Sequence, residues 1–572
     1  MSSVRVPGRM QKMLKHRQAT PPWYLALGPS LPDLTGQTWR DGPLAIAHTQ
    51  PTASARFIVV GDLWLSNRSQ ILHRLGLSPT VDHPDLQLVA QLWEKHGVAS
   101  LAHLQGMFAL AIWDRVQQTL WLVRDRVGAY TLYYTASGST RWVAPRLRTL
   151  APWRSNQLDA IALRDYLCCA FVPGERTLWQ DLRELRPGTY LQIPDGEPQT
   201  YWQPQEQIIH ADKPLTWHAQ ALRSRLEDAV KAYLPPGRPV GAYLSGGVDS
   251  SCITALAAQF HDQPVHTYSI HFGADYPHEL AFSQAVAHHC QTQHHVLEIT
   301  PKQMWQQLPE TLAALDDPIG DPLTVPNLLL GRAAQRDVSV ILNGEGGDPC
   351  FGGPKNKPML LRTLYNPEEA HSDRVTAYLN SFKKCGPDLP HLMRPAIWQM
   401  VRHQPSLFAA DLQSSAAFLN RLMGLNIKFK GADHILTKVN NLTRTAGVQG
   451  RSPLFDASIV ELSLQIPPAY KLAGATEKAV LKAAVADLLP ESVVTRPKKG
   501  MMVPVQAWFR RPWNRRARSL LLRRNAAIAP YLNQSLIRDW LAYRGDLWRR
   551  YGAKLWLLVS LEVWLQVNLG DR

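Results

Sequence analysis

The sequence has few cysteines, and they are not spaced like metal ligands or disulfide partners. Six cysteines are scattered over 572 residues. A structural zinc site needs close pairs of cysteine or histidine, and a disulfide-rich secreted domain needs a much higher cysteine density. We therefore expect neither a zinc finger nor a disulfide framework. The composition fits a reducing cytoplasm best, and the predicted location is cytoplasmic.

Long apolar runs are also missing. No stretch approaches the roughly 20 apolar residues that a membrane-spanning helix needs. The first seventeen residues carry five basic side chains and no acidic one, but no apolar core follows them as in a secretory signal. We therefore predict a chain with no membrane partner. The sequence leaves the oligomeric state open, a homodimer included.

Acidic residues are outnumbered, and the excess positive charge gathers near the C-terminal end. The formal net charge is +16 at pH 7. No recognisable nucleic-acid-binding module accompanies this charge, so we expect a solvated helix face and no nucleic-acid partner. The same region carries tryptophans at partly helical spacing, which indicate core, with a peptide-binding surface as the alternative. The arginines are Arg510, Arg511, Arg515, Arg516, Arg518, Arg523 and Arg524, and the tryptophans are Trp508, Trp513, Trp540, Trp548, Trp556 and Trp564.

What the sequence does contain is typical of a globular α/β protein. Hydrophobic residues make up 45% and charged residues 19% of the chain, and its length allows more than one domain. From about residue 210 strands and helices alternate, which predicts a doubly wound parallel sheet. The strands are expected at 239–244, 265–270, 296–299 and 338–342, with helices from 252 and over 281–287.

The run 243–251 is the most informative stretch of the chain. An apolar strand leads into Ser245-Gly246-Gly247, and Asp249, Ser250 and Ser251 follow at the start of a helix. Glycines let a ligand approach the backbone, while the first-turn N–H groups and the helix dipole favour an anion. The Walker lysine of other phosphate loops is absent. We expect this loop to bind pyrophosphate, although a bare Ser-Gly-Gly is more often a flexible turn.

A second glycine-rich loop follows the strand at 338–342. It reads Asn343-Gly344-Glu345-Gly346-Gly347-Asp348. Alone, it indicates only a tight turn. Because ligands of such sheets bind at the carboxyl ends of strands, both loops can face one crevice. Asp249 and Asp348 then offer the hard oxygen ligands that Mg²⁺ prefers, which leaves Glu345 for other work.

These loops resemble those of the PP-loop ATP pyrophosphatases, and further segments resemble the synthetase domain of asparagine synthetases. The resemblance implies that Leu244 and Ile270 border the adenine, and that Asn343 and Gly344 touch the nucleotide. ATP and Mg²⁺ are the implied cofactors, with Asp249 and Asp348 as magnesium ligands. The further segments are 316–322, 352–353, 450–456 and 496–501. We assign residues 206–572 to this domain, with a helical C-terminal part.

Two catalytic residues follow from the same resemblance. Glu345 falls where asparagine synthetases place the glutamate that handles the proton of the amine. The segment Thr476–Lys482 matches the helix that carries the family's catalytic lysine, which places that lysine at Lys478. Its cation would neutralise charge that builds as the amine attacks. The alternative for a lone helical lysine is a solvated surface position.

The segments over residues 57–203 resemble the N-terminal glutaminase domain of the same enzymes. The implied fold is a sandwich of antiparallel sheets with helices, and we assign residues 1–205 to this degenerate class II glutamine amidotransferase domain. Its catalytic residues have gone. The family nucleophile is a cysteine exposed as residue 1 of the mature chain, whereas Ser2 and Ser3 follow Met1 here and no cysteine precedes Cys168. We therefore predict no glutaminase nucleophile; a serine nucleophile at Ser2 is the alternative.

Further positions of that domain also depart from the family. The arginine-bearing glutamine clamp survives only as His16-Arg17-Gln18, and the oxyanion-hole asparagine is replaced by Val60. Asp85 retains the position that holds the amino group of the substrate. We expect a structural role for the domain, or one in holding a substrate.

The resemblance implies an ATP-dependent amide synthesis through an acyl-adenylate, with release of AMP and pyrophosphate. The expected substrates are a small carboxylate such as aspartate and an amine, with ammonia or another amine as the nitrogen source rather than glutamine. Glu345 favours this asparagine synthetase type, because β-lactam synthetases place a tyrosine there and some lasso peptide cyclases a histidine.

Two alternatives remain open at this point. The inactive glutaminase domain is shared with β-lactam synthetases and lasso peptide cyclases, which form an amide within one substrate, a peptide in the second case. Asn440 replaces a usual aspartate, Gln449 a usual glutamate, and the loop 354–359 is unlike that of asparagine synthetases. A non-catalytic relative with a binding or regulatory role is the second alternative; it predicts damage in both domains, yet the synthetase motifs are intact.

Overall fold

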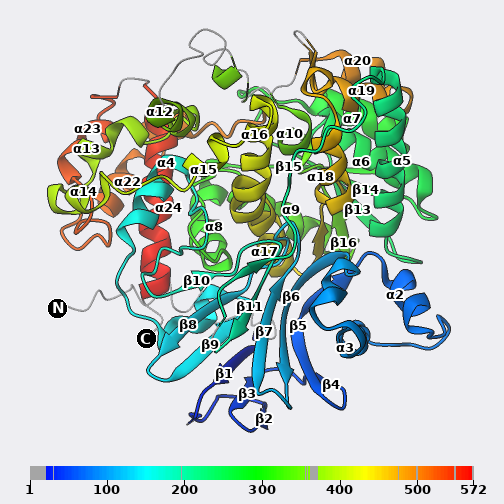
Figure 1. Cartoon of the computed structure of the whole chain (residues 1–572). Helices are drawn as coiled ribbons and strands as arrows, with labels where there is room; N and C mark the ends of the chain where they lie inside the picture. The colour runs from blue at the N-terminus through cyan, green and yellow to red at the C-terminus, as the bar shows by residue number, and fades with distance from the viewer. Residues whose placement is uncertain are drawn as a thin grey trace. The chain divides into compact units, whose positions relative to one another are not determined.

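The computed structural model describes residues 21–29, 31–194, 196–353, 356, 358–360, 371–473, 476–497, 500–546 and 549–569, without the side chains of 371–373. These residues form two compact units (Figure 1). We call residues 21–159 with 174–203 the sandwich unit, and residues 160–173 with 204–569 the parallel-sheet unit. Residues 160–173 thus group with the later part of the chain. The division at residue 205 into two domains stays a prediction.

The sandwich unit contains two six-stranded sheets whose neighbouring strands are antiparallel. The strand orders are β10-β8-β9-β1-β3-β2 and β12-β11-β7-β6-β5-β4. This confirms the predicted antiparallel sandwich. The strands are β1 Tyr24–Leu27, β2 Thr38–Asp41, β3 Leu44–Ala47, β4 Thr52–Ala53, β5 Phe57–Leu65, β6 Gly106–Asp114, β7 Thr119–Arg124, β8 Tyr133–Ser137, β9 Thr140–Ala144, β10 Arg183–Glu184, β11 Thr189–Ile193 and β12 Gln199–Thr200.

Two apolar clusters hold this unit together, one on each face of the second sheet. Val60 belongs to the cluster between the two sheets, while its neighbour Val59 belongs to the cluster on the outer face. Alternation along β5 sends successive side chains to opposite faces. Helices α2 (Arg68–Leu75) and α3 (Asp85–His96) contribute residues to the outer cluster.

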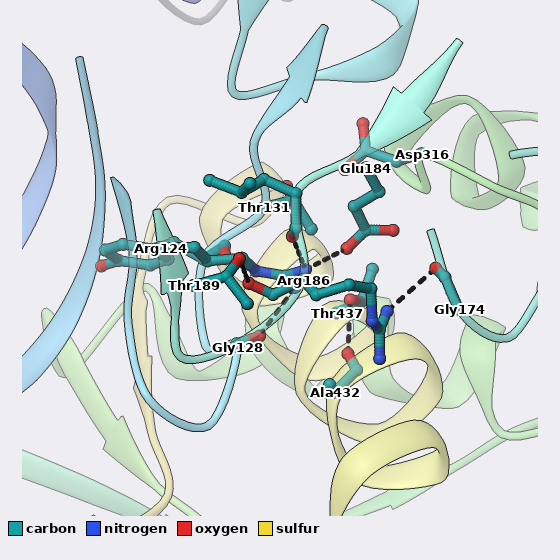
Figure 2. Close-up of polar contacts among 12 residues, drawn as sticks. Arg124, Gly128, Thr131, Gly174, Glu184, Arg186, Thr189, Asp316, Ala432 and Thr437 are labelled. Atoms are coloured by element: carbon teal, nitrogen blue, oxygen red, sulfur yellow. Dashed lines mark hydrogen bonds and ion pairs between the residues drawn. The ribbon is translucent and has the colours of Figure 1, made fainter. Parts of the chain in front are cut away.

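A buried arginine stabilises the turn that follows β7. The guanidinium of Arg124 is fully buried, lies 2.6 Å from a carboxylate oxygen of Glu184 and donates to the carbonyl of Gly128 at 3.2 Å (Figure 2). The next residue, Asp125, accepts hydrogen bonds from the backbone N–H groups of Gly128 and Ala129 at 2.8 and 2.9 Å. Burial raises the pKa of Asp125, and these bonds counter the effect. Arg124 and Asp125 therefore both have a structural role in this turn.

The parallel-sheet unit is built on five parallel strands in the order β15-β14-β13-β16-β17. This confirms the predicted doubly wound α/β fold. The strands are β13 Val240–Tyr243, β14 His266–His271, β15 Gln293–Glu298, β16 Val340–Leu342 and β17 Gln449–Arg451. The sequence predicted the first four within a few residues of their ends. Strand β17 was not predicted, because its three residues carry no strand pattern of their own.

The strand order changes direction at β13. After β13 the chain adds β14 and β15 on one side, and it then returns to place β16 on the other side. Right-handed crossovers place α6 (Val248–Phe260) and α7 (Leu280–His289) on one face, and α9 (Thr324–Ala334) on the opposite face. The carboxyl ends of β13 and β16 therefore flank the switch point, where open α/β sheets bind ligands.

The C-terminal helix α24 (Tyr551–Leu569, red in Figure 1) is buried nearly all round. Its Glu562 accepts hydrogen bonds from the N–H groups of Ala527 and Ile528 at 3.0 and 2.9 Å. Five of the six tryptophans singled out in this region are buried to 1% exposure or less, and Trp548 lies outside the described residues. The prediction of core is thus confirmed for those five. Of the seven arginines predicted to be solvated, Arg510, Arg511, Arg515, Arg516 and Arg524 are exposed, whereas Arg518 and Arg523 are half-buried and Arg523 is paired with Glu562 at 3.1 Å.

Three further predictions concern disulfides, membrane-spanning helices and the location of the protein. All six cysteines are unpaired, which agrees with the absence of a disulfide framework. Within the residues that the structure describes, no helix is both long and apolar enough to span a bilayer. The cytoplasmic location stays a prediction.

Candidate active site

The first loop of the site connects β13 to α6 and needs glycine at Gly246. Its φ is +74°, in the left-handed region that favours glycine. A Cβ atom at this position would also lie 2.6 Å from the backbone nitrogen of Ser283 in α7. The loop is thus fixed by the close approach of α7.

Two serine hydroxyls of this loop contact each other. The Oγ atoms of Ser245 and Ser250 are 3.0 Å apart, and the N–H of Ser245 donates to Ser250 Oγ at 3.1 Å. Both residues border the cavity described below. Ser251, by contrast, is fully buried and, like Gly246 and Gly247, does not border it. Gly246, Gly247 and Ser251 therefore contribute to the conformation of the loop, while Ser245 and Ser250 border the cavity.

The second loop packs directly on the first, and its glycines permit the contact. A Cβ atom at Gly344 would lie 2.4 Å from the backbone nitrogen of Ser250, and one at Gly347 only 2.1 Å from Asp249 Oδ1. Real Cβ atoms do not approach that closely. The sequence placed the two loops at one crevice, and the structure brings them into contact.

The side-chain amide of Asn343, at the end of β16, is hydrogen-bonded to neighbouring residues. Its Nδ2 donates to the carbonyl of Arg451 at 3.0 Å, and its Oδ1 accepts from Ser452 Oγ at 2.9 Å and from the N–H of Glu345 at 3.1 Å. Asn343 therefore ties β16 to β17 and sets the direction in which Glu345 leaves the strand.

Lys478 joins the two aspartates that the sequence singled out as metal ligands. Its Nζ lies 2.8 and 2.6 Å from the two carboxylate oxygens of Asp249, and 2.5 Å from Asp348 Oδ1. The side chain of Lys478 is 1% exposed, so the solvated alternative is wrong. A buried ion pair of this kind must be fully compensated, because each ion loses its hydration.

The backbone of Lys478 differs from the prediction. The sequence placed this lysine within a helix, but Thr476–Glu477 form the short strand β19, and α19 runs from Ala479 to Ala484. Lys478 is the N-cap between them, with φ +56° and ψ +37°. A left-handed lysine costs of order 1 kcal/mol or more, so the surrounding contacts must hold it there. The buried ion pairs supply that constraint.

The donor set around Lys478 fits a magnesium ion. Two carboxylates and one ammonium leave a net negative charge at the edge of the cavity, and oxygen donors are the ligands that Mg²⁺ prefers. Asp249 and Asp348 both border the cavity. These two residues would hold the ion, and Lys478 would then contact phosphate oxygens.

The two loops open onto one cavity of about 360 Å³. Seven of the ten residues expected to bind ATP or pyrophosphate border it, as do both predicted metal ligands and Glu345. Lys478 does not border the cavity itself, but it is paired with Asp249 and Asp348, which do. The bordering residues include Leu244, Ser245, Asp249, Ser250, Ile270, Asn343, Gly344, Glu345 and Asp348 from the prediction, and Tyr268, Asp321, Asn327, Lys430, His434 and Lys438 outside it.

Three charged or titratable residues at this cavity were not assigned from the sequence. Lys438 Nζ lies 2.8 Å and His434 Nε2 3.2 Å from Asp321 Oδ2. Burial lowers the pKa of His434 to about 4, so this histidine is neutral at neutral pH. Burial also lowers the pKa of Lys438, but the negative charges of Asp321 and Glu345 raise it by more, so Lys438 stays a cation.

This cluster comes from segments far apart in the chain. His434 belongs to the π-helix Asn426–Leu436, and Lys438 to α17 (Thr437–Thr445), which continues it. π-Helical turns occur often at functional sites. The segment 316–322 that carries Asp321 was recognised as a family motif, but no sequence signal tied it to His434.

The positions expected to bind glutamine are apolar or already paired. Val60 is 2% exposed and packs in the core between the two sheets, so it offers no donor to an oxyanion. Asp85 Oδ1 accepts a hydrogen bond from Arg68 Nε at 2.9 Å. Ser2 and the segment His16-Arg17-Gln18 lie outside the described residues. Burial raises the pKa of Cys168 to about 12, so its thiol is not a nucleophile.

Two other departures have structural explanations. Gln449 Oε1 accepts from the guanidinium of Arg451 at 2.7 Å, so a neutral amide fills the position of the usual glutamate. Asn440 is buried and does not border the cavity. In the third departure, Pro354, Lys355 and Lys357 lie outside the described residues.

Comparison with protein families decides the class of this site. The asparagine synthase family model matches residues 221–566, more than half of the chain. The chain belongs to the asparagine synthase family. It is therefore an ATP-dependent carbon–nitrogen ligase, as the sequence predicted. A glutamine amidotransferase domain model matches residues 53–202, which cover most of the sandwich unit and also residues 160–173 of the parallel-sheet unit.

Individual members of this family align with most of the chain at low identity. It is similar to asparagine synthetase [glutamine-hydrolyzing] 1 of Bacillus subtilis, with 24% identity over 76% of this chain and 74% of the relative. A putative glutamine-hydrolysing asparagine synthetase of Mycobacterium bovis is 26% identical over 80% of this chain and 77% of its own length. Asparagine synthetase B of Escherichia coli is 24% identical over 73% of this chain and 64% of its own length.

Proposed function

We propose that this ligase forms an amide through an acyl-adenylate, most like asparagine synthesis from aspartate, with ammonia or another amine as the nitrogen source. The observation that supports the proposal is the convergence of Asp249, Asp348, Lys478 and Glu345 on one cavity. A carboxylate is a poor electrophile, because its leaving group would be oxide. Attack on the α-phosphate of ATP converts it into a mixed anhydride whose leaving group is AMP.

The first loop binds the departing pyrophosphate in this proposal. Ser245 and Ser250 present hydroxyls at the N-terminus of α6, where the helix dipole favours an anion. Asp249 and Asp348 hold magnesium, which when bound offsets the charge of the phosphates. Lys478 exchanges a carboxylate partner for a phosphate oxygen, and its cation stays within the buried cluster.

Glu345 acts in the second half of the reaction. It borders the cavity one residue after Gly344, and the Oδ1 of Asn343 orients its backbone N–H. The amine attacks the activated carbonyl, and Glu345 accepts its proton as the new C–N bond forms and AMP leaves. Lys438 borders the same cavity and keeps its positive charge there, because Asp321 and Glu345 raise its pKa by more than burial lowers it.

The sandwich unit is unsuited to supply ammonia from glutamine. Val60 replaces an oxyanion donor with an apolar side chain, and Asp85 is paired with Arg68. We therefore propose that free ammonia, or an amine belonging to the substrate, is the nucleophile.

A second candidate is an intramolecular cyclase, in which carboxylate and amine belong to one molecule. The apolar Val60 and the paired Asp85 favour it, because such an enzyme needs no glutaminase. The presence of Glu345 at the cavity favours the asparagine synthetase type instead.

Pyrophosphate release from Mg-ATP tests the proposal. The purified protein is assayed with aspartate plus ammonium, with aspartate plus glutamine, and with no added substrate, and Asp249→Ala is the control. We expect pyrophosphate and asparagine with ammonium only. If no pyrophosphate is released with either nitrogen source, other carboxylates are tried. Release with one of them would redirect the search to cyclase substrates, and release with none would indicate a non-catalytic role.

A further inference from the structure

Two histidines and an aspartate form a cluster away from the predicted magnesium ligands. His266 lies at the start of β14, His295 lies in β15, and Asp337 follows α9. One ligand atom from each residue lies within 4.8 Å of the other two. Imidazole and carboxylate together are typical ligands of zinc and other divalent transition metals.

The strand register explains why these side chains meet. Tyr268 is paired with His295 across the two parallel strands. His266 and Tyr268 are two residues apart, so they lie on the same face of β14. His294 falls on the other face, where its Nδ1 lies 2.9 Å from Thr267 Oγ1. His294 is thus a neighbour that cannot join the cluster.

The distances are near those of a tetrahedral site. The Nδ1 of His266 and the Nε2 of His295 are 3.3 Å apart. Two nitrogens bound to Zn²⁺ at about 2.0–2.1 Å in tetrahedral geometry lie about 3.3 Å apart. His295 Nε2 and Asp337 Oδ2 are 3.9 Å apart, and the three ligand atoms lie within 4.8 Å of one another, so Asp337 must move closer to both imidazoles when a metal binds.

A tyrosine positions both the carboxylate and one imidazole. Tyr268 donates its hydroxyl hydrogen to Asp337 Oδ2 at 2.8 Å, and its ring is stacked on that of His295 with centroids 4.8 Å apart. The ring packs against Gly241 of β13, where a Cβ atom would lie 3.3 Å from Tyr268 Cε2. Metal ligands are usually held by such outer hydrogen bonds.

The cluster lies beside a cavity. His295 and Asp337 border a cavity of about 870 Å³, which gives room for water as a fourth ligand. Arg332 and Arg336 also border this cavity, which leaves space for an anionic ligand beside the metal.

We propose that His266, His295 and Asp337 form a binding site for one divalent transition-metal ion of the zinc type, with water as the fourth ligand. None of its three ligands borders the cavity of the two loops, so the site is separate from the proposed ligase site, although Tyr268 borders both cavities. Tyr268 is a positioning residue that orients Asp337 and His295.

Titration with Co²⁺ tests this site, because tetrahedral Co²⁺ absorbs visible light and octahedral Co²⁺ does so only weakly. The full chain, stripped of metal, is titrated in excess Mg²⁺, which keeps Co²⁺ from Asp249 and Asp348. We expect one equivalent of tetrahedral Co²⁺, displaced by Zn²⁺. His295→Gln and Asp337→Asn should each abolish the tetrahedral spectrum, and Tyr268→Phe should weaken binding about 10- to 100-fold.

The matched control is His294→Gln, which removes an adjacent imidazole on the other face and should leave the spectrum unchanged. Thermal melting of each variant confirms that it is folded, and the conservative Asp337→Asn keeps an oxygen to accept the Tyr268 hydrogen bond. Binding of Co²⁺ without a tetrahedral spectrum would overturn the proposal. A spectrum that survives in both His295→Gln and Asp337→Asn would overturn it as well.

Discussion

The two units differ in the side chains at their candidate sites: charged groups line one site, whereas the other has an apolar residue and a paired carboxylate. In the parallel-sheet unit, glycines let two loops touch, and the buried Lys478 is paired with Asp249 and Asp348 at the cavity. In the sandwich unit, Val60 packs into the core and Asp85 pairs with Arg68. Buried charge is costly and persists where it is compensated, whereas an unused polar position is readily replaced by a stable apolar one. The contrast supports our proposal that the chain keeps a synthetase site and has lost its glutaminase site.

The largest effect that would sharpen this contrast is expected at Glu345. The variant Glu345→Gln removes the proton acceptor and should lower amide formation by about 100- to 10,000-fold. Formation of the adenylate should persist, because Glu345 does not contact the pyrophosphate loop in our account. Isotope exchange between pyrophosphate and ATP in the presence of the carboxylate measures that first step. The control is Glu491→Gln on the exposed start of α20 (Glu491–Thr495). Equal loss of both steps would place Glu345 in nucleotide binding instead.

Lys478 should come next. The variant Lys478→Met keeps much of the side-chain volume but removes the cation, and should reduce pyrophosphate release by about 100- to 1,000-fold. It also leaves Asp249 and Asp348 facing each other without a positive charge, so added Mg²⁺ should stabilise the variant against heat more than it stabilises the wild type. Lys482→Met, four residues along the same segment and only partly buried, is the matched control. A fully active Lys478→Met would contradict the assigned role.

Paired aspartate variants compare the two units directly. Asp249→Asn should reduce pyrophosphate release by about 100-fold, because one ligand of the phosphate-bound metal loses its charge. Asp85→Asn should leave the ammonium-supported rate unchanged, since Asp85 only pairs with Arg68 on the sandwich unit. Steady-state assays at saturating Mg-ATP measure both. A similar loss in Asp85→Asn would show that the sandwich unit takes part in the reaction.

A smaller effect is expected from the contact between the loops. In Gly347→Ala the new Cβ would lie 2.1 Å from Asp249 Oδ1, so Asp249 must move and the rate should fall about 10-fold or more. Gly424→Ala in α16 (Phe418–Leu425) meets no atom within 4 Å and should be neutral or slightly stabilising. Rates and melting temperatures of the two variants are compared. Wild-type activity in Gly347→Ala would mean that the loops are not tightly coupled.

The smallest effect concerns the pH dependence of stability. His434 has an ordinary pKa of 6.5, which burial lowers to about 4 in the folded protein. The unfolded chain therefore binds a proton between these values and the folded one does not, so His434 lowers stability as the pH falls from about 6.5 towards 4. The effect reaches at most about 3 kcal/mol.

Replacing His434 should flatten that part of the stability profile. Denaturant unfolding of His434→Gln is compared with that of the exposed control His403→Gln from pH 7 to 4, and only the slopes are compared, because His434 also stacks on Phe171. An unchanged slope in His434→Gln would show that His434 is protonated in the folded state.

Local sequence predicted the parts of the site that lie within one segment. The strand, loop and helix around Ser245 and the glycines around Glu345 each follow from turn and helix-start chemistry, and parallel strands bring their carboxyl ends together. Gly347 could be read as a turn residue, but not as the contact of Asp249, because that needs the packing of two loops. For the same reason the family resemblance located Lys478, while its left-handed N-cap position was missed.

Contacts between distant segments were not predictable from the sequence. Asp321, His434 and Lys438 meet because a π-helix shifts the side chains of its segment relative to an α-helix, and the sequence has no period that distinguishes the two. The cluster of His266, His295 and Asp337 depends on the register of β14 and β15 and on the small size of Gly241. Such register is set by the sheet as a whole.

The most direct test of the central claim follows nitrogen from its source into the product. The wild-type protein is incubated with Mg-ATP and aspartate, once with isotopically labelled ammonium and once with glutamine labelled at its side-chain amide, and the amide product is examined by mass spectrometry. The account predicts labelled product from ammonium and none from glutamine. Label transferred from glutamine would contradict it, because the sandwich unit would then retain a working glutaminase.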